Sequence, residues 1–122
     1  MTSITITIPL PPHAVKPNAR SHWRAKATAV KHYRKAAWAA AMGALRGAHP
    51  PMWLKAKYHI AAYFPTLQRL DPDNLVSSLK AGIDGIADAG IVANDKDLWP
   101  ERPTISKDKN NPRIEITITE ET

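Results

Sequence analysis

Cysteine is absent from the 122 residues of this chain. Disulfide bonds, thiolate zinc sites and a cysteine nucleophile are therefore excluded, and a reducing cytosol is the natural compartment. No apolar run approaches the roughly 18 residues that span a bilayer. The N-terminal MTSITITIPLPP has no basic segment ahead of an apolar stretch, so a secretory signal is not expected. We expect a cytoplasmic protein with no membrane partner.

Acidic residues are missing from the first half of the chain, where no Asp or Glu precedes Asp71. Residues 1–69 carry eleven Lys and Arg and all five His, whereas residues 70–98 carry six Asp and only two Lys. That short segment therefore has a formal charge of −4, and because the whole chain is +6, the rest carries +10. A basic surface attracts polyanions, chiefly nucleic acid or acidic membrane, and a merely solubilising surface is the alternative.

The remaining composition is that of one globular domain spanning residues 1–122. Hydrophobic residues make up 43% of the chain and charged residues 23%, which is enough apolar material for a modest core and argues against disorder along the whole chain. Eleven prolines are the one excess over average usage. The sequence has no internal repeat, low-complexity tract or interdomain linker.

Three segments alternate apolar and polar residues with the period of a β-strand that buries one face. Residues 3–8 place isoleucines on one side and threonines on the other, and Pro9 follows them. Residues 53–64 place Leu54 on the predicted inner face and Trp53 on the basic outer face. Residues 112–120 repeat the pattern of the first segment. Residues 98–106 predict a weaker strand that Pro100 and Pro103 interrupt.

Two segments show the spacing of amphipathic helices. Residues 25–45 are Ala-rich with a basic exposed face, and Gly47 is suited to end them. The second helix begins with Asp71 as N-cap and Pro72 in the first turn, and runs to about residue 89 before Gly90. Because each predicted strand has only one apolar face, we expect an α+β sandwich with helices on one side of the sheet. The strand order is not fixed by these patterns.

The second predicted helix carries Asp73, Lys80 and Asp84 on one exposed ridge. Each has an ordinary explanation, since Asp73 favours the helix dipole and Lys80 and Asp84 form an i,i+4 ion pair. One helix cap needs only one Asp, however, so Asp71, Asp73 and Asp95 together leave oxygen donors unexplained. Asp95 reaches the others only if the chain after the helix folds back as a strand, which spacing alone does not establish.

Converging carboxylates would form an oxygen-only site for a hard cation such as Mg²⁺, and Mn²⁺ suits the same ligands. A bound cation would reverse the local repulsion between carboxylates and a phosphodiester, polarise the phosphoryl oxygen and lower the pKa of an attacking water. Lys80 could then stabilise charge that develops on the phosphate. The residues alone leave capping and solvation as an equal alternative to a nuclease-like metal site.

The segment DPDNLVSSLKAGIDGIADAGIVAND, residues 71–95, resembles the signature of the RusA-type Holliday junction resolvases, a bacterial and phage-borne family. The segments ITIPLPP, NARSHWRAKA and IEITIT are similar to other parts of that family, so the resemblance covers most of the chain. It fixes far more positions than a lone D-x-D motif. It implies a small α+β fold with a mixed sheet and two main helices on one face, a homodimer, and Mg²⁺-dependent paired nicking of four-way DNA junctions in recombination and repair.

The resemblance also implies roles for individual residues. Asp71, Asp73 and Asp95 match the metal-binding catalytic acids, and Lys80 matches a helical lysine of the family. Asn94 departs from the pattern, because the family has an acid there and an amide adds no charge. The residues that we expect to contact DNA are Arg20, Trp23, Arg24, Lys26, Lys31, Arg34, Lys35 and Arg69.

Other chemistry-bearing residues carry less weight. The five histidines have no ligand spacing within a helix, so a transition-metal site is not expected. Core packing is the better expectation for most of the tryptophans, whereas Trp23 in the basic loop could stack on unpaired bases. Three functions remain open: a structure-selective endonuclease, a weak or inactive junction-binding protein of the same fold, and a basic adaptor or phage structural protein without nucleic-acid chemistry.

Overall fold

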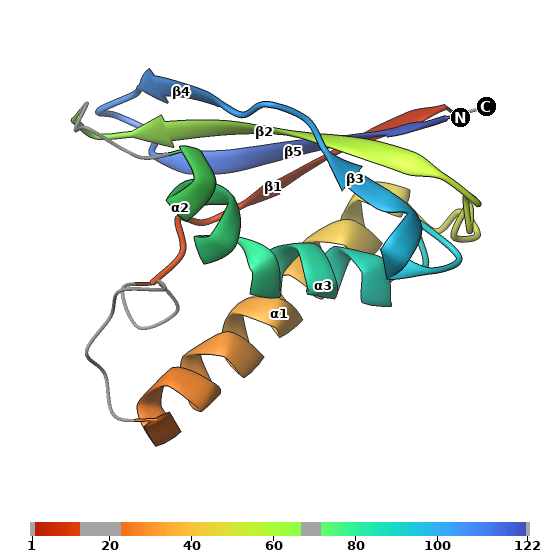
Figure 1. Cartoon of the computed structure of the whole chain (residues 1–122), viewed down its shortest axis with the longest axis horizontal. Coiled ribbons are helices and arrows are strands. Elements are labelled where there is room, and N and C mark those ends of the chain that lie inside the picture. The colour runs from red at the N-terminus through yellow and green to blue at the C-terminus, as the bar shows by residue number, and fades with distance from the viewer. Residues whose placement is uncertain (1, 13–22, 67–71, 122) are drawn as a thin grey trace.

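A mixed β-sheet covered on one face by helices forms the protein (Figure 1). The structure, a computed structural model, describes residues 2–12, 23–66 and 72–121. This small α+β domain confirms the predicted fold class. The elements in chain order are β1 Ser3–Ile8, α1 Trp23–Leu45, β2 Ala56–Phe64, α2 Pro72–Ser78, α3 Lys80–Asp88, the 3₁₀ helix η2 Asp95–Asp97, β3 Leu98–Pro100, β4 Thr104–Lys107 and β5 Arg113–Glu120.

The five strands run in the order β1-β5-β2-β3, and β4 pairs with β2 further along the same edge. β1 and β2 are both antiparallel to β5, whereas β3 and β4 are parallel to β2. The predicted weak strand is therefore two short strands, and the interruption falls at residues 101–103 between its two prolines. The two edges of the sheet consequently differ: β1 is one continuous strand, and β3 with β4 is a broken one.

The core lies between the sheet and the helices, as the alternating isoleucines predicted. Ile6, Ile116 and Ile60 are matched in register across β1, β5 and β2, and each is almost completely buried. Burying a side chain of this size contributes about 1.5–3 kcal/mol. From α1, the buried residues begin at Tyr33 and are Tyr33, Ala37, Ala41 and Leu45.

The start of β2 differs from the prediction. Trp53 was expected on the outer face and Leu54 on the inner face, but Trp53 is 5% exposed and Leu54 is 78% exposed. The chain turns at Met52, which has a positive φ of 51°, and Trp53 then forms a parallel bridge with Val92. This bridge draws the indole into the core before the regular strand begins at Ala56, so the alternation does not extend back to residue 53.

The acidic helix is also different from the prediction, because it is two helices that meet at Leu79. Leu79 has φ −98° and ψ 1°, and its N–H donates to the carbonyl of Val76 three residues back. The Ser78 hydroxyl donates to the Leu75 carbonyl at 2.8 Å, a local bond that competes with helical continuation. The continuous ridge predicted for residues 73–84 is therefore broken. The predicted cap residue Asp71 lies outside the described residues.

α1 and α3 pack with their backbones almost in contact. A Cβ at Gly85 would collide with the carbonyl oxygen of Arg34 and lie 3.1 Å from the Cβ of Ala37. A Cβ at Gly82 would lie 3.1 Å from the ring of Tyr33. The two glycines thus set how closely the acidic helix approaches the basic one.

We predict that Gly85→Ala destabilises the protein by about 3 kcal/mol, because the added methyl group meets backbone that cannot move aside. Gly43→Ala is the matched control within α1, since a Cβ there meets nothing within 4 Å. That control should stabilise the helix by about 0.5–1 kcal/mol. Urea unfolding followed by circular dichroism measures both changes, and equal effects at the two sites would contradict the packing described.

Candidate functional site

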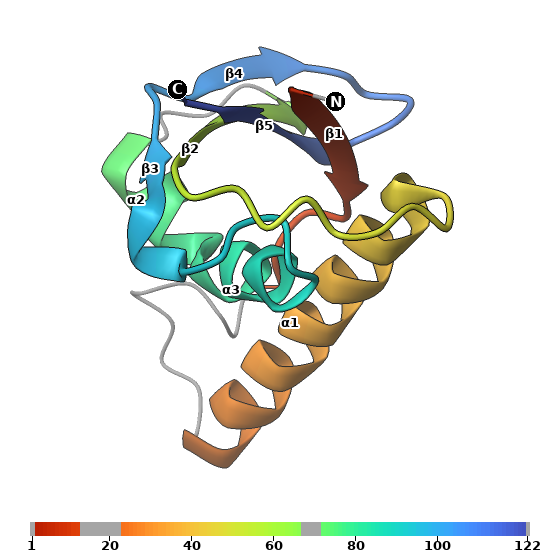
Figure 2. The ribbon, with the colours of Figure 1, turned by 90° about the vertical axis from the view of Figure 1, so that its right-hand side faces the viewer.

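The first half of α1 is a basic helix that projects beyond the rest of the fold (Figures 1 and 2). Residues 23–45 contain five Lys and Arg and no acidic residue, and the fully buried positions begin only at Tyr33. Arg24 and Lys26 stand at the N-terminus, where the helix dipole disfavours positive charge. These two positive charges therefore do not favour the helix through its dipole.

An exposed ridge runs along α1 on the side away from its buried residues. Its members follow one another at intervals of seven, four, three and four residues, so they share one helical face. Two of its three cations lie in the projecting half and the third lies just beyond it, and two apolar side chains, each 40% exposed, continue the line toward the body of the protein. This α1 ridge consists of Arg24, Lys31, Lys35, Trp38 and Met42.

Arg34 was predicted to contact DNA but is engaged within the protein. Its Nε and Nη2 donate to the two carboxylate oxygens of Asp88 at 2.6 and 2.8 Å. This hydrogen-bonded pairing raises the pKa of Arg34 and lowers the pKa of Asp88 from its ordinary value of 3.8, and Asp84 and Asp95 add smaller Coulombic contributions at Arg34. Arg34 therefore fastens α1 to α3 and is not available to a phosphate in the same way as the α1 ridge.

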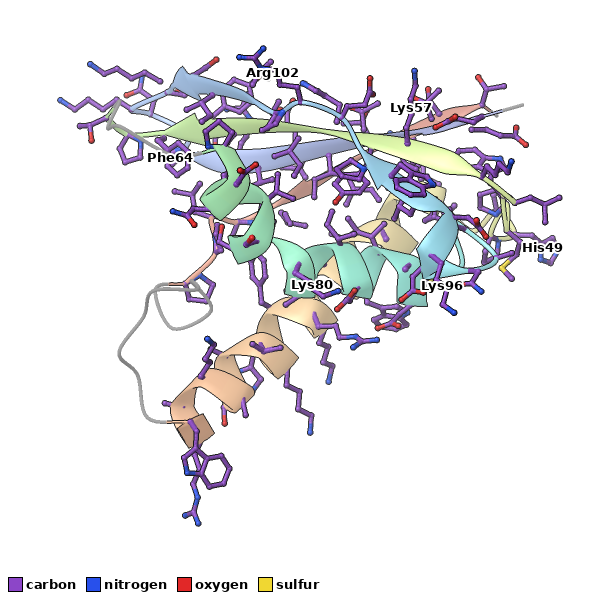
Figure 3. The ribbon with its side chains drawn as sticks, in the orientation of Figure 1. His49, Lys57, Phe64, Lys80, Lys96 and Arg102 are labelled. Carbon is purple, nitrogen blue, oxygen red and sulfur yellow. The ribbon has the colours of Figure 1, made fainter. Side chains whose placement is uncertain are left out.

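The predicted metal ligands are not brought together by the described residues of one chain. Asp73 lies in the first turn of α2, and Asp95 begins η2. Lys80 and Lys96 stand at opposite ends of α3 (Figure 3), and α3, about 14 Å long, lies between the α2 helix of Asp73 and the η2 helix of Asp95. No group of three His, Asp or Glu in residues 2–12, 23–66 and 72–121 could hold a metal ion. The predicted Mg²⁺ or Mn²⁺ site also includes Asp71, which lies outside the described residues, so this site stays a prediction.

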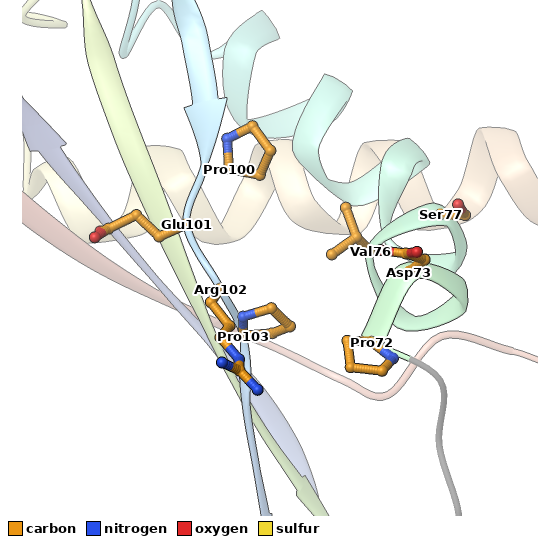
Figure 4. Close-up of a pocket in the computed structure, with 8 residues that line it drawn as sticks. All are labelled: Pro72, Asp73, Val76, Ser77, Pro100, Glu101, Arg102 and Pro103. Carbon is orange, nitrogen blue, oxygen red and sulfur yellow. The ribbon is translucent and has the colours of Figure 1, made fainter.

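The chain does fold back after Gly90, but another segment returns to α2. β3 runs parallel to β2, and its continuation brings residues 100–103 opposite the first turns of α2. A cleft of about 630 Å³ lies between them (Figure 4). Its lining residues are Pro72, Asp73, Val76, Ser77, Pro100, Glu101, Arg102 and Pro103.

The cleft has Arg102 on the wall opposite Asp73 (Figure 4), a residue that the sequence did not predict for this site. Arg102 is exposed on the link between β3 and β4 and forms no ion pair within the described part of the chain. The neighbouring Glu101 points away from α2 (Figure 4), and its carboxylate oxygen lies 3.9 Å from the Nζ of Lys57. Three prolines stiffen the two walls. The only signal in the sequence was the P-E-R-P run, which the prediction treated as an interruption of a strand.

Two residues of the family motif have local structural roles. Lys80, the predicted catalytic lysine, lies 3.4 Å from the carboxylate of Asp84, which is the i,i+4 ion pair expected of these residues. Asn94, the departure from the family pattern, caps η2 because its side-chain oxygen accepts the N–H of Lys96 at 3.0 Å. An amide oxygen performs this capping as well as a carboxylate would.

The aromatic residues are more exposed than predicted. Trp53 is the one buried tryptophan, whereas Trp38 and Trp99 lie at the surface, so the expectation of core packing for most of them is wrong. Trp23 is 67% exposed, and the guanidinium of Arg24 lies 5.1 Å from its ring centroid.

Lys26, another predicted DNA contact, is half-buried, and the predicted DNA contacts Arg20 and Arg69 lie outside the described residues. In the ranges that the structure describes, no helix has the length and apolar character of a membrane span.

Comparison with known proteins places the chain beside a bacterial relative. A protein of Xylella fastidiosa (strain Temecula1), described as an uncharacterized protein, is 35% identical over 118 residues. The match covers 94% of this chain and 75% of that protein. No family model matches the sequence. The chain belongs to the same family as the Xylella protein.

We predict that Asp88→Asn lowers stability by about 0.5–1 kcal/mol at pH 7, the range of exposed ion pairs, because both side chains are more than 40% exposed. The folded-state pKa of Asp88 is lowered, so this contribution is present above the ordinary carboxyl pKa and is lost as the pH falls through the folded value. Urea unfolding at pH 7 and at about pH 2.5 should therefore show a difference between wild type and variant only at the higher pH. A difference that persists in acid would assign the loss to packing instead.

Proposed function

We propose that this member of the family binds branched DNA and cuts four-way junctions as a Mg²⁺-dependent, structure-selective endonuclease of recombination and repair. DNA binding is supported by one observation above all, the acid-free projecting half of α1. The cutting step is supported by the resemblance of residues 71–95 to the RusA-type resolvases. The positions of the described carboxylates add no support to it. We also propose that the protein acts in the cytoplasm of a bacterium, from a host or phage gene, and as a homodimer.

The α1 ridge has the charge and length to follow a phosphate backbone. At 1.5 Å per residue, Arg24, Lys31 and Lys35 stand about 10 Å and 6 Å apart along the helix axis. Duplex DNA carries one negative charge about every 1.7 Å of its axis, so each cation meets phosphates of its own. Counterion release from those phosphates would provide a favourable contribution that does not depend on sequence.

The shape of α1 supports the same partner. An α-helix with its side chains is about 10–12 Å across, and the major groove is about 12 Å wide. Because the sheet and α3 contact mainly the second half of α1, the first half can approach a groove without the body of the protein colliding with the duplex (Figure 2). Trp23, at the very tip, would then reach the nucleic acid first.

The cleft beside Asp73 is the place where the described residues would meet a phosphate near the predicted catalytic acids. Arg102 supplies a cation to the cleft that contains Asp73, and arginine forms charge-assisted, often bidentate hydrogen bonds with phosphate. Val76 and the prolines offer an apolar wall to a sugar or base. We therefore add Arg102 to the residues proposed to hold DNA, and we no longer count Arg34 among them.

A second candidate function is junction binding without cutting. The separation of Asp73 from Asp95 favours it, and so does Asn94, whose amide serves as a helix cap where the family has an acid. The basic surface would be unchanged in such a protein. The two candidates therefore differ in cleavage and not in affinity.

We predict that reversing the three cations of the α1 ridge, in Arg24→Glu/Lys31→Glu/Lys35→Glu, weakens junction binding at least 100-fold at low salt. The slope of log affinity against log salt should become shallower by about 3, since each lost phosphate contact changes it by about 0.9. The control triple Lys55→Glu/Lys107→Glu/Lys109→Glu has the same charge change on exposed residues far from the ridge in sequence. Fluorescence anisotropy with a labelled junction across salt concentrations measures the affinity of both variants. Equal losses of affinity would mean that net charge alone, and not the position of the α1 ridge, determines binding.

We predict paired symmetric nicks when the protein is incubated with an end-labelled four-way junction and Mg²⁺, with none in EDTA or in a linear duplex of the same sequence. Asp71→Asn and Asp73→Asn should abolish cutting and leave junction affinity within about threefold, because removal of a carboxylate lessens repulsion of DNA. Glu121→Gln, at an exposed position remote from these acids in the sequence, is the control. Tight binding without nicks in either Mg²⁺ or Mn²⁺ would establish the second candidate, and the absence of binding would reject both.

A further inference from the structure

β1 forms one edge of the sheet in the described part of the chain. β1 pairs with β5 on one side, and no other described strand lies on its other side. Its six residues, SITITI, contain no charge and no proline, and the register with β5 runs through all six without a bulge. Natural edge strands usually carry charges, prolines, bulges or a covering segment that prevents pairing with another chain.

The opposite edge of the sheet, formed by β3 and β4, has features that prevent pairing with another chain. β3 and β4 have three and four residues, Pro100 ends one of them, and Lys107 ends the other. The link of residues 101–103 interrupts the edge between them. Short, charged and proline-containing strands resist edge-to-edge association. β1 has none of these features although it is longer than either.

The hydrogen-bonding groups that point outward from β1 can be identified from the register. Thr2 accepts a hydrogen bond from the N–H of Glu120 at 2.8 Å, so Thr2 directs its backbone groups toward β5. Residues alternate in this respect along an antiparallel pair, and therefore the isoleucines at 4, 6 and 8 also face β5. The backbone N–H and C=O groups of Ser3, Thr5 and Thr7 consequently point away from the sheet.

The sequence of β1 is complementary to itself. In an antiparallel pairing centred on Thr5, Ser3 stands opposite the partner's Thr7, and Thr5 stands opposite the partner's Thr5. Ile4 then meets the Ile6 of the second copy on the core face, Ile8 meets its Thr2, and hydroxyl side chains meet hydroxyl side chains on the outer face. β1 already pairs with β5 in this manner, since Ile6 is opposite Ile116 and the hydroxyls of Thr5 and Thr117 lie 3.0 Å apart.

We propose that β1 pairs with β1 of a second copy of this chain across a twofold axis, so that two five-stranded sheets become one continuous sheet. The three outward residues of each copy would form up to six backbone hydrogen bonds, two for each opposed pair. The occupant is a second copy because the edge is uncharged and its Ile/Thr alternation matches itself. This inference deepens the homodimer included in the proposed function by naming its surface, and it stands or falls separately from DNA binding.

The rest of the fold presents β1 rigidly for this pairing. The Tyr33 hydroxyl of α1 donates to the carbonyl of Pro9 at 2.7 Å, directly after the strand. Ile4, Ile6 and Ile8 are already buried in the single copy, so the edge is ordered before a partner arrives. A six-residue strand pair buries less than the roughly 1,200 Å² of a stable interface. Dimerisation should therefore depend on concentration.

Sedimentation equilibrium on the full chain tests the pairing with two substitutions at one position. Thr5→Pro removes an N–H that points outward and places a ring on the edge, while the bonds that Ile4 and Ile6 make to β5 remain. It should raise the dimer dissociation constant at least tenfold. Thr5→Ala removes the hydroxyl but keeps the N–H, and should dimerise within about threefold of wild type.

A second measurement keeps the inference testable if Thr5→Pro fails to fold by circular dichroism. Hydrogen exchange on wild type should show the amides of Ser3, Thr5 and Thr7 protected at high concentration and exposed at low concentration. A wild-type chain that stays monomeric, a folded Thr5→Pro variant that dimerises like wild type, or amides that exchange equally at both concentrations would each overturn the proposal. Junction affinity of Thr5→Pro is measured alongside, so that loss of dimerisation and loss of DNA binding are distinguished.

Discussion

The near-contact of the α1 and α3 backbones is the constraint on which the rest of the arrangement depends. Gly85 permits it, because any side chain at that position would occupy the space of the Arg34 carbonyl. The bidentate pair of Arg34 with Asp88 then fixes the two helices in rotation as well as in distance. α3 holds only the second half of α1 in this way, and so the first half is left to project from the domain (Figure 1).

This contact also explains part of the division of charge along the chain. Asp88 neutralises the one cation of α1 that faces α3, and Asp84 lies beside Lys80. Two of the six acids in residues 70–98 thus balance charges inside the protein, which is an ordinary role for carboxylates near a basic helix. Asp73 lies in the first turn of α2 and Asp95 begins η2, so neither belongs to the contact between α1 and α3. The acidic segment is therefore not one cluster but a set of residues with different tasks along a broken helix.

Local periodicity predicted the fold well wherever one element faces one environment throughout. The isoleucines of β1 and β5 alternate without exception, and their burial follows the alternation. The predictions failed where a contact with a distant segment or a single side-chain hydrogen bond decides the local structure. Trp53 is buried because Val92 pairs with it, and the acidic helix breaks at Leu79, where the Ser78 hydroxyl bonds to the backbone one turn back. Neither partner is visible in the spacing of residues along the chain.

Residue spacing was also insufficient to predict the arrangement of the candidate site. The acids were found from the sequence because their residue types stand out against a basic chain, but whether they meet depends on where the return strand runs. β3 starts after Asp95, and the chain that continues from it brings Glu101 and Arg102, not Asp95, to the cleft of Asp73. Since the intervening helix is rigid, no rotation of side chains in one chain closes that gap. Cutting by a site that combines Asp73 with Asp95 would thus require either a rearrangement of α2 against α3 at Leu79 or an acid from a second copy. The break at Leu79 is the place for such a movement, because Leu79 belongs to neither helix and its N–H bonds to the Val76 carbonyl three residues back instead of continuing the helical pattern.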